Sequence, residues 1–436
     1  MSEGRPRVAL LHFTCPPVIG GVEGLLRTHA RLAVQHGYAV SVLAGRGRQF
    51  DRRVPVQLFP WLDSKHPEIV RVAEELRAGT VSARFAAVRE RLVAWWRAEV
   101  APRYDTVVVH NAFTLHFNLP LTAALHAVAA AGRPRLVAWC HDLAWTNPLY
   151  LPLLHEAYPW QLLKTCHPAV RYVAVSHDRQ RDLAAVAGVP TEQIAVVPAG
   201  VDLARWARFG AATQRLLAAL HLAPEELVLL LPARITRRKN IELAIRIVAA
   251  LRQRGARPRL LVTGPPGPHD VRAGAYLDEL LQLCRELGVE REVAFLYPHR
   301  LRDATVADLY QVADALLFPS RQEGFGIPLL EAGLSRLPVF CTDLAPLREI
   351  AGASAHYFSP DTDPATVAEG LLESLRHDRA ARLRRRVLRD YAWPAIFARQ
   401  IAPLLAGAMP DTAPCAPGPS IPEPRQPAQS QEQWET

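Results

Sequence analysis

The fold is decided by the stretch Phe318-Pro319-Ser320-Arg321-Gln322-Glu323-Gly324-Phe325-Gly326-Ile327-Pro328-Leu329-Leu330-Glu331. An apolar run, Ala315–Phe318, leads into it and is typical of a buried strand, whereas the apolar run Ile327–Leu334 favours a helix. The stretch therefore predicts a strand, a tight loop and a helix. Glycines in such a loop let the backbone approach a ligand closely, and free N–H groups at a helix start attract an anion.

Two carboxylates in this stretch are candidates for ligand contact. Glu323 belongs to the predicted loop, and Glu331 follows eight positions later in the predicted helix. Eight residues are close to a whole number of helical turns, so we expect both on roughly the same side. An exposed carboxylate is the ordinary alternative for each, and we expect the Phe325 ring to pack.

Strand patterns alternate with helix patterns along the whole chain, which predicts doubly wound parallel sheets. In the first half the predicted strands are Val8–Phe13, Val40–Leu43, Thr106–Val109, Leu136–Trp139, Tyr172–Val175 and Ile194–Val197. The pattern then restarts with Leu227–Leu231, Ile241–Leu251, Arg259–Val262 and Tyr276–Leu287. Ligands of such sheets bind at the carboxyl ends of the strands, so we expect the site between two Rossmann-like halves.

A second motif, Arg234-Ile235-Thr236-Arg237-Arg238-Lys239-Asn240, follows the strand Leu227–Leu231. Arg234 and Lys239 are five positions apart on a strand-to-helix loop, so both cations can converge on one anion beside a helix N-terminus. By itself this spacing has little specificity, and a solvated loop is the alternative.

Three further pairs occupy loops at predicted strand ends: Gly20 with Gly21, His110 with Asn111, and His141 with Asp142. Because the carboxyl ends of parallel strands line the ligand edge, we expect these pairs to face the site. A plain turn is the alternative for the glycines, and a structural role is the alternative for the histidines.

The glutamate stretch resembles the signature of retaining, GT-B-fold glycosyltransferases of family 4, also described as glycosyl transferases group 1. The resemblance covers roughly residues 7–407 and implies an α/β fold with two Rossmann-like parallel-sheet domains facing a central cleft. It implies an acceptor-side domain at 1–200, a nucleotide-sugar-binding domain at 201–390 and a terminal helix at 391–409 packing back on the first domain. Residues 410–436, rich in Pro, Gln and Ser, are expected to be disordered.

The resemblance also implies roles for the candidate residues. Arg234 and Lys239 would bind the donor diphosphate, Glu331 the ribose hydroxyls, and Glu323 with His141 the transferred sugar near the reacting carbon. His110 and Asn111 would contact the acceptor. The remaining donor contacts would come from glycine-loop positions: Gly20, Gly21, Gly324, Phe325, Gly326 and Ile327. Ala233 and Asn240 stand where the family commonly has Gly, which makes the shape of that loop uncertain.

The implied activity is transfer of a sugar from a nucleotide diphosphate-sugar, with retention, to a glycan, a lipid-linked sugar or a small metabolite. We expect a hexosyltransferase-like enzyme without metal or other cofactor, because preorganised cations replace the divalent ion. Asp361-Thr362-Asp363 has the Asp-x-Asp pattern of a metal-binding motif, but we expect it to lie away from the cleft. The alternatives are a GT-B nucleotide-sugar epimerase or phosphorylase, a Rossmann oxidoreductase, and a non-catalytic nucleotide-sugar-binding partner subunit.

Length and composition agree with a globular protein of two domains: 436 residues, 50% hydrophobic and 21% charged. The net charge of +9 suits phosphorylated substrates, but the basic residues are spread and no nucleic-acid motif is present, so we expect no nucleic-acid partner. We expect at most weak peripheral membrane association, with Trp95 and Trp96 forming a buried helix end. Scattered cysteines and a polar start predict reduced thiols, no leader peptide and a cytoplasmic location, at most at the inner membrane face.

Overall fold

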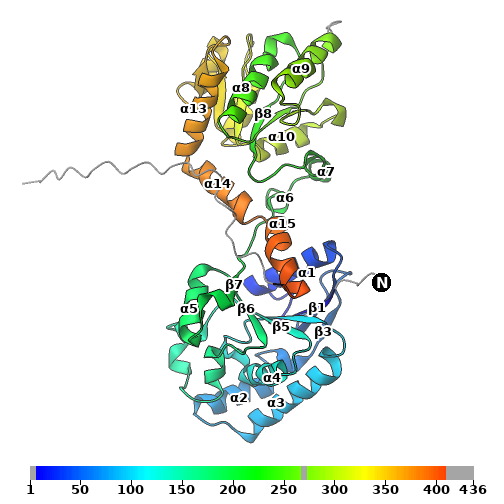
Figure 1. Cartoon of the computed structure of the whole chain (residues 1–436), viewed down its shortest axis with the longest axis vertical. Helices are drawn as coiled ribbons and strands as arrows, with labels where there is room; N and C mark the ends of the chain where they lie inside the picture. Colours follow the sequence, from blue (N-terminus) through cyan, green and yellow to red (C-terminus); the bar gives the residue numbers. More distant parts are fainter. Residues whose placement is uncertain (1–5, 267–272, 409–436) are drawn as a thin grey trace, which may run out of the picture. The chain divides into compact units, whose positions relative to one another are not determined.

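The computed structural model describes residues 6–266 and 273–408, which form two compact units (Figure 1). The N-terminal unit comprises the chain up to Val201 and the segment from Tyr391 onward. The C-terminal unit comprises Asp202–Asp390. The tail 410–436, predicted to be disordered, lies outside the described residues.

A seven-stranded parallel sheet forms the centre of the N-terminal unit, in the order β3-β2-β1-β4-β5-β6-β7. Its strands are β1 (Arg7–Thr14), β2 (Ala39–Arg46), β3 (Val56–Leu58), β4 (Thr106–His110), β5 (Arg135–Cys140), β6 (Val170–Ala174) and β7 (Ile194–Val196). His110 of β4 pairs in register with Trp139 of β5, so their carboxyl ends are level. This register brings the residues that follow β4 and β5 together.

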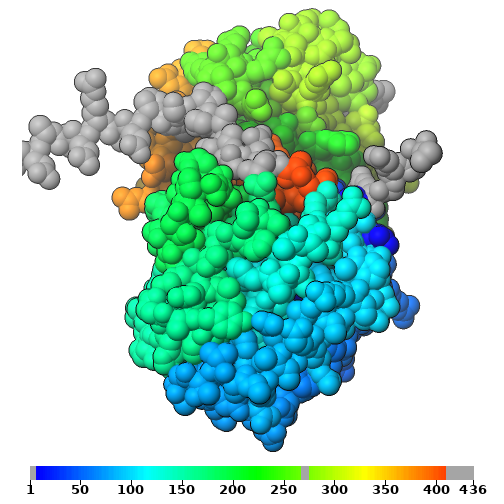
Figure 2. Space-filling view, turned by 60° about the horizontal axis from the view of Figure 1, so that its bottom comes forward, coloured from blue at the N-terminus to red at the C-terminus, as the bar shows by residue number. Residues whose placement is uncertain are grey.

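Helices cover both faces of this sheet, as its continuous apolar strands require. The longer ones are α1 (Gly21–Gln35), α2 (Pro67–Arg77), α3 (Ala83–Trp95), α4 (Leu119–Ala129) and α5 (His177–Ala187). In the space-filling view of Figure 2 the segment that contains α2 and α3, coloured blue, forms the lower part of this unit's surface. Trp96 is 3% exposed and Trp95 stacks on Phe59, which confirms the predicted buried helix end.

The chain returns to the N-terminal unit through α15 (Trp393–Ile396), a π-helical turn (Phe397–Ile401) and α16 (Ala402–Ala406). Their apolar side chains are buried in the same core as β1 and β2. Thr106 Oγ1 donates to the Leu405 carbonyl over 3.2 Å, which ties the end of this segment to the start of β4. The predicted helix is therefore interrupted by a π-turn, and its expected end at Met409 lies outside the described residues.

In the C-terminal unit a six-stranded parallel sheet has the order β10-β9-β8-β11-β12-β13. Its strands are β8 (Leu227–Leu231), β9 (Pro258–Val262), β10 (Val293–Phe295), β11 (Ala315–Phe318), β12 (Val339–Thr342) and β13 (His356–Phe358). Every residue of β8 and β11 is buried, as expected for central strands covered on both faces. The two parallel sheets confirm the predicted α/β architecture.

The helices of this unit are α6 (Leu203–Trp206), α7 (Ala211–Leu220), α8 (Ile241–Gln253), α9 (Ala273–Leu287), α10 (Asp303–Val312), α11 (Ile327–Leu334), α12 (Ala345–Ala351), α13 (Pro364–His377) and α14 (Arg379–Asp390). Figure 1 shows α8 and α13 side by side, and the two helices pack against each other. No helix within 6–266 and 273–408 is long and apolar enough to cross a membrane.

Candidate active site

In the C-terminal unit the glutamate stretch forms the predicted strand, loop and helix, with β11 ending at Phe318 and α11 beginning at Ile327. Gly326 caps α11 at φ 119°, and a Cβ there would lie 2.5 Å from Leu347 Cδ2. A Cβ on Gly324 would meet nothing within 4 Å. The fold therefore requires glycine at position 326, whereas Gly324 leaves the loop backbone open to a ligand. The Phe325 ring, expected to pack, is 53% exposed.

Lys239 and Glu323, 84 positions apart in sequence, form an ion pair. Their side chains are 10% and 8% exposed, and the Lys239 ammonium lies 4.8 Å above the Phe318 ring. Arg238 adds a weaker contact, its Nη1 lying 3.8 Å from Glu323 Oε2. The pair forms because the loops after β8 and β11 follow neighbouring strands. It places a cation and a carboxylate at one point of the carboxyl edge.

The other cations of the 234–240 loop have different roles. Arg234 is exposed and makes no ion pair or side-chain hydrogen bond within the described ranges. Arg237 instead binds both carboxylate oxygens of Glu279 at 2.6 and 2.8 Å and lies over the Tyr276 ring. Arg237 therefore anchors the loop to α9, and Arg234 stays available to a ligand.

Asn240, where the family commonly has Gly, adopts φ 51° directly before α8. Asn tolerates this left-handed conformation better than most residues, and its Nδ2 also donates to the Pro360 carbonyl over 3.0 Å. The substitution therefore preserves the turn and adds a link to the segment after β13.

The segment Asp361–Asp363, predicted to lie away from the site, contacts it. Arg321 Nη1 lies 2.6 Å from Asp361 Oδ1, and the Arg321 N–H donates to the Arg238 carbonyl over 2.8 Å. The prediction was wrong because this segment follows β13, whose carboxyl end faces the same edge as that of β11. Asp363 caps α13 through the Ala365 N–H. Nowhere in the described residues do three His, Cys, Asp or Glu side chains gather as metal ligands.

Glu331, on α11, has a partner that the sequence did not indicate. Its Oε2 accepts a hydrogen bond from the Tyr310 hydroxyl over 2.5 Å. Tyr310 belongs to α10 and is 2% exposed; burial and this hydrogen bond raise its pKa. The buried hydroxyl orients the carboxylate, whose Oε1 makes no hydrogen bond within residues 6–266 and 273–408. A Tyr within a helical pattern was the one sequence signal for Tyr310, and such a signal is not specific.

In the N-terminal unit His141 follows β5 and is held by His110, the last residue of β4, and by Asn111, which follows it. His110 Nδ1 lies 3.0 Å from His141 Nε2, and Asn111 Oδ1 accepts the His141 N–H over 2.8 Å. His110 is 0% and Asn111 4% exposed, so both lie behind His141, and acceptor contact by either stays a prediction. Burial, with a smaller contribution from His12, lowers the pKa of His141 to about 4. Its imidazole is therefore neutral at neutral pH.

The Gly20-Gly21 loop lies at the start of α1, directly over a buried carboxylate. A Cβ on Gly20 would lie 2.1 Å from Glu23 Oε2, whereas one on Gly21 would meet nothing within 4 Å. Glu23 is 9% exposed and accepts a hydrogen bond from Thr14 Oγ1 over 2.5 Å. Sequence reasoning missed Glu23, although an acidic residue in the first helical turn is a recognisable feature.

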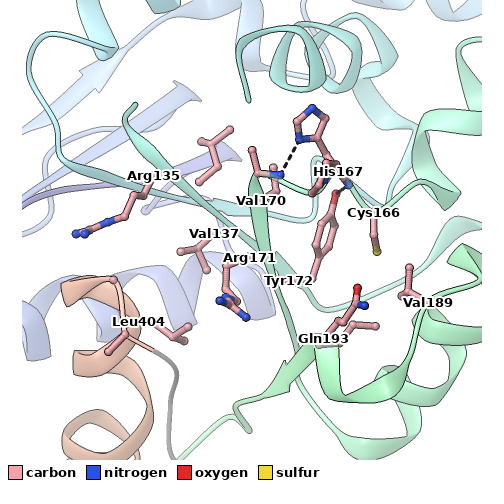
Figure 3. A pocket seen from close by; sticks show the side chains of 16 residues that line it. Arg135, Val137, Cys166, His167, Val170, Arg171, Tyr172, Val189, Gln193 and Leu404 are labelled. Atoms are coloured by element: carbon pink, nitrogen blue, oxygen red, sulfur yellow. Dashed lines mark hydrogen bonds between the residues drawn. The ribbon is translucent and has the colours of Figure 1, made fainter. Parts of the chain in front are cut away.

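A separate hollow of about 330 Å³ lies at the opposite edge of the N-terminal sheet (Figure 3). Its lining includes the first residues of β5, β6 and β7, among them Arg135, Val170 and Ile194. Arg135 Nη2 is engaged with Thr106 Oγ1 and the Leu405 carbonyl. The hollow faces the amino ends of the strands and is not part of the predicted site.

Two known families match this chain. Residues 19–205 match the family described as Glycosyltransferase Family 4, and residues 214–391 match Glycosyl transferases group 1. A D-inositol 3-phosphate glycosyltransferase of Nocardia farcinica is 33% identical over 41% of this chain and 39% of its own length. A glycogen synthase of Mycobacterium tuberculosis is 26% identical over 69% of this chain and 67% of its own.

The chain thus spans about two fifths of the first curated relatives that it matches. Among solved structures, a sucrose-phosphate synthase of Thermosynechococcus elongatus is 17% identical, with a TM-score of 0.36 over 93% of this chain and 100% of that one. The two family matches follow each other along the chain and correspond to its two parallel-sheet halves. The chain belongs to the glycosyltransferases of group 1 and family 4.

Proposed function

We propose that this protein transfers a sugar from a nucleotide diphosphate-sugar to a hydroxyl acceptor, with retention of configuration and without a metal. The observation that carries the proposal is the buried Lys239–Glu323 pair on the carboxyl edge of the C-terminal sheet. Arg234 lies on the same loop as Lys239, is exposed, and makes no ion pair within residues 6–266 and 273–408. A cation and a carboxylate in contact, with a second cation on the same loop, suit a ligand that is anionic at the diphosphate and rich in hydroxyls at the sugar.

The diphosphate would be bound by Arg234, Lys239 and the start of α11. Lys239 is neutralised by Glu323 in the structure, so an arriving diphosphate competes for its ammonium. Glu323 is then released to accept hydrogen bonds from the sugar, while the cations stabilise the charge that develops on the leaving phosphate. Open backbone at Gly324 and the positive end of the α11 dipole support the same assignment.

Glu331 would bind the ribose. Its Oε2 is occupied by Tyr310, and a carboxylate has enough lone pairs to accept from ribose hydroxyls as well. The fixed orientation lowers the entropy that binding costs, because the carboxylate does not need to be ordered by the ligand.

In the proposed reaction the bond from the sugar C1 to the phosphate oxygen breaks, and a bond from C1 to the acceptor oxygen forms on the same face. The acceptor hydroxyl proton passes to the leaving phosphate oxygen. His141, neutral because burial lowers its pKa to about 4, would donate a hydrogen bond to the sugar and not act as the base. The named activities of the relatives concern an inositol phosphate and glycogen, so the acceptor class stays open.

Nucleotide binding can be tested by thermal shift with UDP, GDP, ADP and their common sugars, without added metal. We expect one base to raise Tm in the wild type and to lose most of that shift in Glu331→Ala. Glu373→Ala is the matched control, since Glu373 is an exposed glutamate of the same unit whose one ion-pair partner among the described residues is His377.

The absence of any shift with every nucleotide would contradict the proposal. A shift without slow release of sugar from the donor would favour a binding subunit, and conversion of the donor to another nucleotide-sugar would favour an epimerase. Retention is then read from the anomeric proton coupling of the product once an acceptor is found.

A further inference from the structure

Two imidazole rings meet end to end at the carboxyl edge of the N-terminal sheet, where β4 and β5 end. The His110 and His141 rings are within 18° of parallel, with centroids 5.4 Å apart and the nitrogens His110 Nδ1 and His141 Nε2 3.0 Å apart. The distance between the centroids is about the distance between the two nitrogens plus the radius of each ring. The two nitrogens therefore lie on the line between the centroids, and the rings meet edge to edge in nearly one plane and are not stacked face to face. This is the geometry of an N–H···N hydrogen bond, in which one nitrogen carries the proton and the other is bare.

The surroundings of His110 decide which ring donates. His110 Nε2 is fully buried and has no hydrogen-bond partner in the described part of the chain. If His141 donated, the neutral His110 ring would carry its proton on Nε2, as an unpaired buried N–H. Such orphaned donors are rare in folded proteins because burial removes their hydrogen bond to water. If His110 donates from Nδ1, the buried Nε2 is a bare nitrogen among the rings of His29 and Trp139.

His110 is also fixed in place. It is the last residue of β4 and 0% exposed, and its carbonyl accepts a hydrogen bond from His12 Nδ1 over 3.2 Å. The Asn111 side chain fixes the backbone of His141. Two consecutive residues at the end of β4 thus hold His141: His110 contacts its ring, and Asn111 contacts its backbone.

We propose that His110 is a positioning residue that donates from Nδ1 to His141 Nε2 and so keeps His141 in the tautomer with its proton on Nδ1. This role rests on the proposed function. His141 Nδ1 has no partner within the described ranges and is not among their fully buried atoms, so it is accessible to a ligand. His141 then offers a hydrogen-bond donor to a sugar oxygen and has no accessible bare nitrogen with which to take a proton. Burial, which lowers the pKa of His141 to about 4, keeps the ring in this neutral form.

The tautomer can be measured directly by two-bond ¹H–¹⁵N correlation on the full chain labelled with ¹⁵N-histidine. The His141 signals are assigned by their loss in His141→Gln. We expect a protonated Nδ1 and a bare Nε2 in the wild type and in His110→Asn, whose side-chain amide can donate from near the same point. His110→Phe should release His141 toward the Nε2-protonated form. His126→Phe, which removes another buried histidine without contact to His141, should change nothing.

An Nε2-protonated His141 in the wild type would overturn the inference, as would an unchanged His141 in His110→Phe. If His110→Phe does not fold, the wild-type and His110→Asn spectra decide alone. The spectra can be recorded without turnover. A protein that binds no nucleotide would therefore refute the proposed function, whereas the tautomer assignment would still be tested by the spectra.

Measured turnover distinguishes a positioning role of His110 from a role in packing alone. We expect His110→Phe to lower kcat by on the order of 10-fold or more with little change in donor KM, and His110→Asn to restore most of it. Equal losses of kcat in both variants would show that His110 only fills space.

Discussion

At the scale of single residues, the most consequential contact is the ion pair between Lys239 and Glu323. Both side chains are at most 10% exposed, so each charge depends on the other for compensation. Neighbouring Arg238 reaches the same carboxylate only at 3.8 Å. The pair therefore compensates both buried charges, and in the proposed function it would set how strongly Lys239 attracts a diphosphate.

Replacing Glu323 by Gln should separate these two effects. The substitution leaves the Lys239 ammonium buried without its carboxylate, so we expect a loss of about 3 kcal/mol in unfolding free energy by urea denaturation. Nucleoside diphosphate affinity, measured by calorimetry, should rise because Lys239 is no longer neutralised. Glu373→Gln is the exposed control, and weaker diphosphate binding in Glu323→Gln would contradict the assignment.

Buried histidines give the molecule a pH dependence. Burial lowers the pKa of His29 to about 3, and of His126 and His141 to about 4. Between pH 6.5 and about 4 the unfolded chain binds more protons than the folded one, so stability is full above pH 6.5 and falls as pH drops. Each histidine contributes a slope of up to about 1.4 kcal/mol per pH unit.

Urea midpoints from pH 7.5 to 4.5 measure this slope. His126→Phe should reduce it, whereas His377→Gln should not, because the His377 side chain is 72% exposed. Constant stability across this range would show that these histidines do not remain neutral in the folded protein.

At the scale of elements, the turn from β11 into α11 separates two uses of glycine. Gly326 is required by its φ of 119° and by Leu347, whereas a Cβ on Gly324 would point into open space. Alanine at these two positions therefore tests the fold and the ligand contact independently.

Gly326→Ala should destabilise the C-terminal unit by about 1–3 kcal/mol, measured as a lower urea midpoint, because of backbone strain and the Leu347 contact. Gly324→Ala should leave the midpoint unchanged and weaken donor binding. Equal loss of stability in both variants would mean that the loop is not as open at Gly324 as the structure indicates.

At the scale of the whole molecule, the chain begins and ends its described course in one unit. The segment after Tyr391 supplies Trp393, Phe397, Ile401 and Leu404 to the core that includes β1 and β2. The N-terminal unit is therefore complete only after this late segment of the chain has been made.

Phe397→Ala should cost about 3–5 kcal/mol, as expected for a phenyl ring that is 0% exposed. Phe325→Ala is the matched control, because that ring is 53% exposed and its loss should change stability little. Denaturation followed by tryptophan fluorescence measures both, and a small effect of Phe397→Ala would contradict the packing of the terminal segment.

The sequence determined the elements whose patterns are local. Strands β8 and β11 match their predicted ranges, because central strands of parallel sheets read as continuous apolar runs. The loop and helix after β11 followed from its glycines and apolar run. Strands β3, β10, β12 and β13 were not predicted; each has only three or four residues, and such short runs carry little pattern of their own.

Tertiary structure alone decided which side chains meet. Asp361 joins Arg321 because β13 ends at the same edge as β11, and sheet order is not written in local periodicity. Tyr310 reaches Glu331 from a different helix, and His110 meets His141 because β4 and β5 end level. Residue types and spacing thus located the candidate site. Contacts between segments distant in sequence determined which of its side chains are fixed by hydrogen bonds, which are uncharged and which remain available to a ligand.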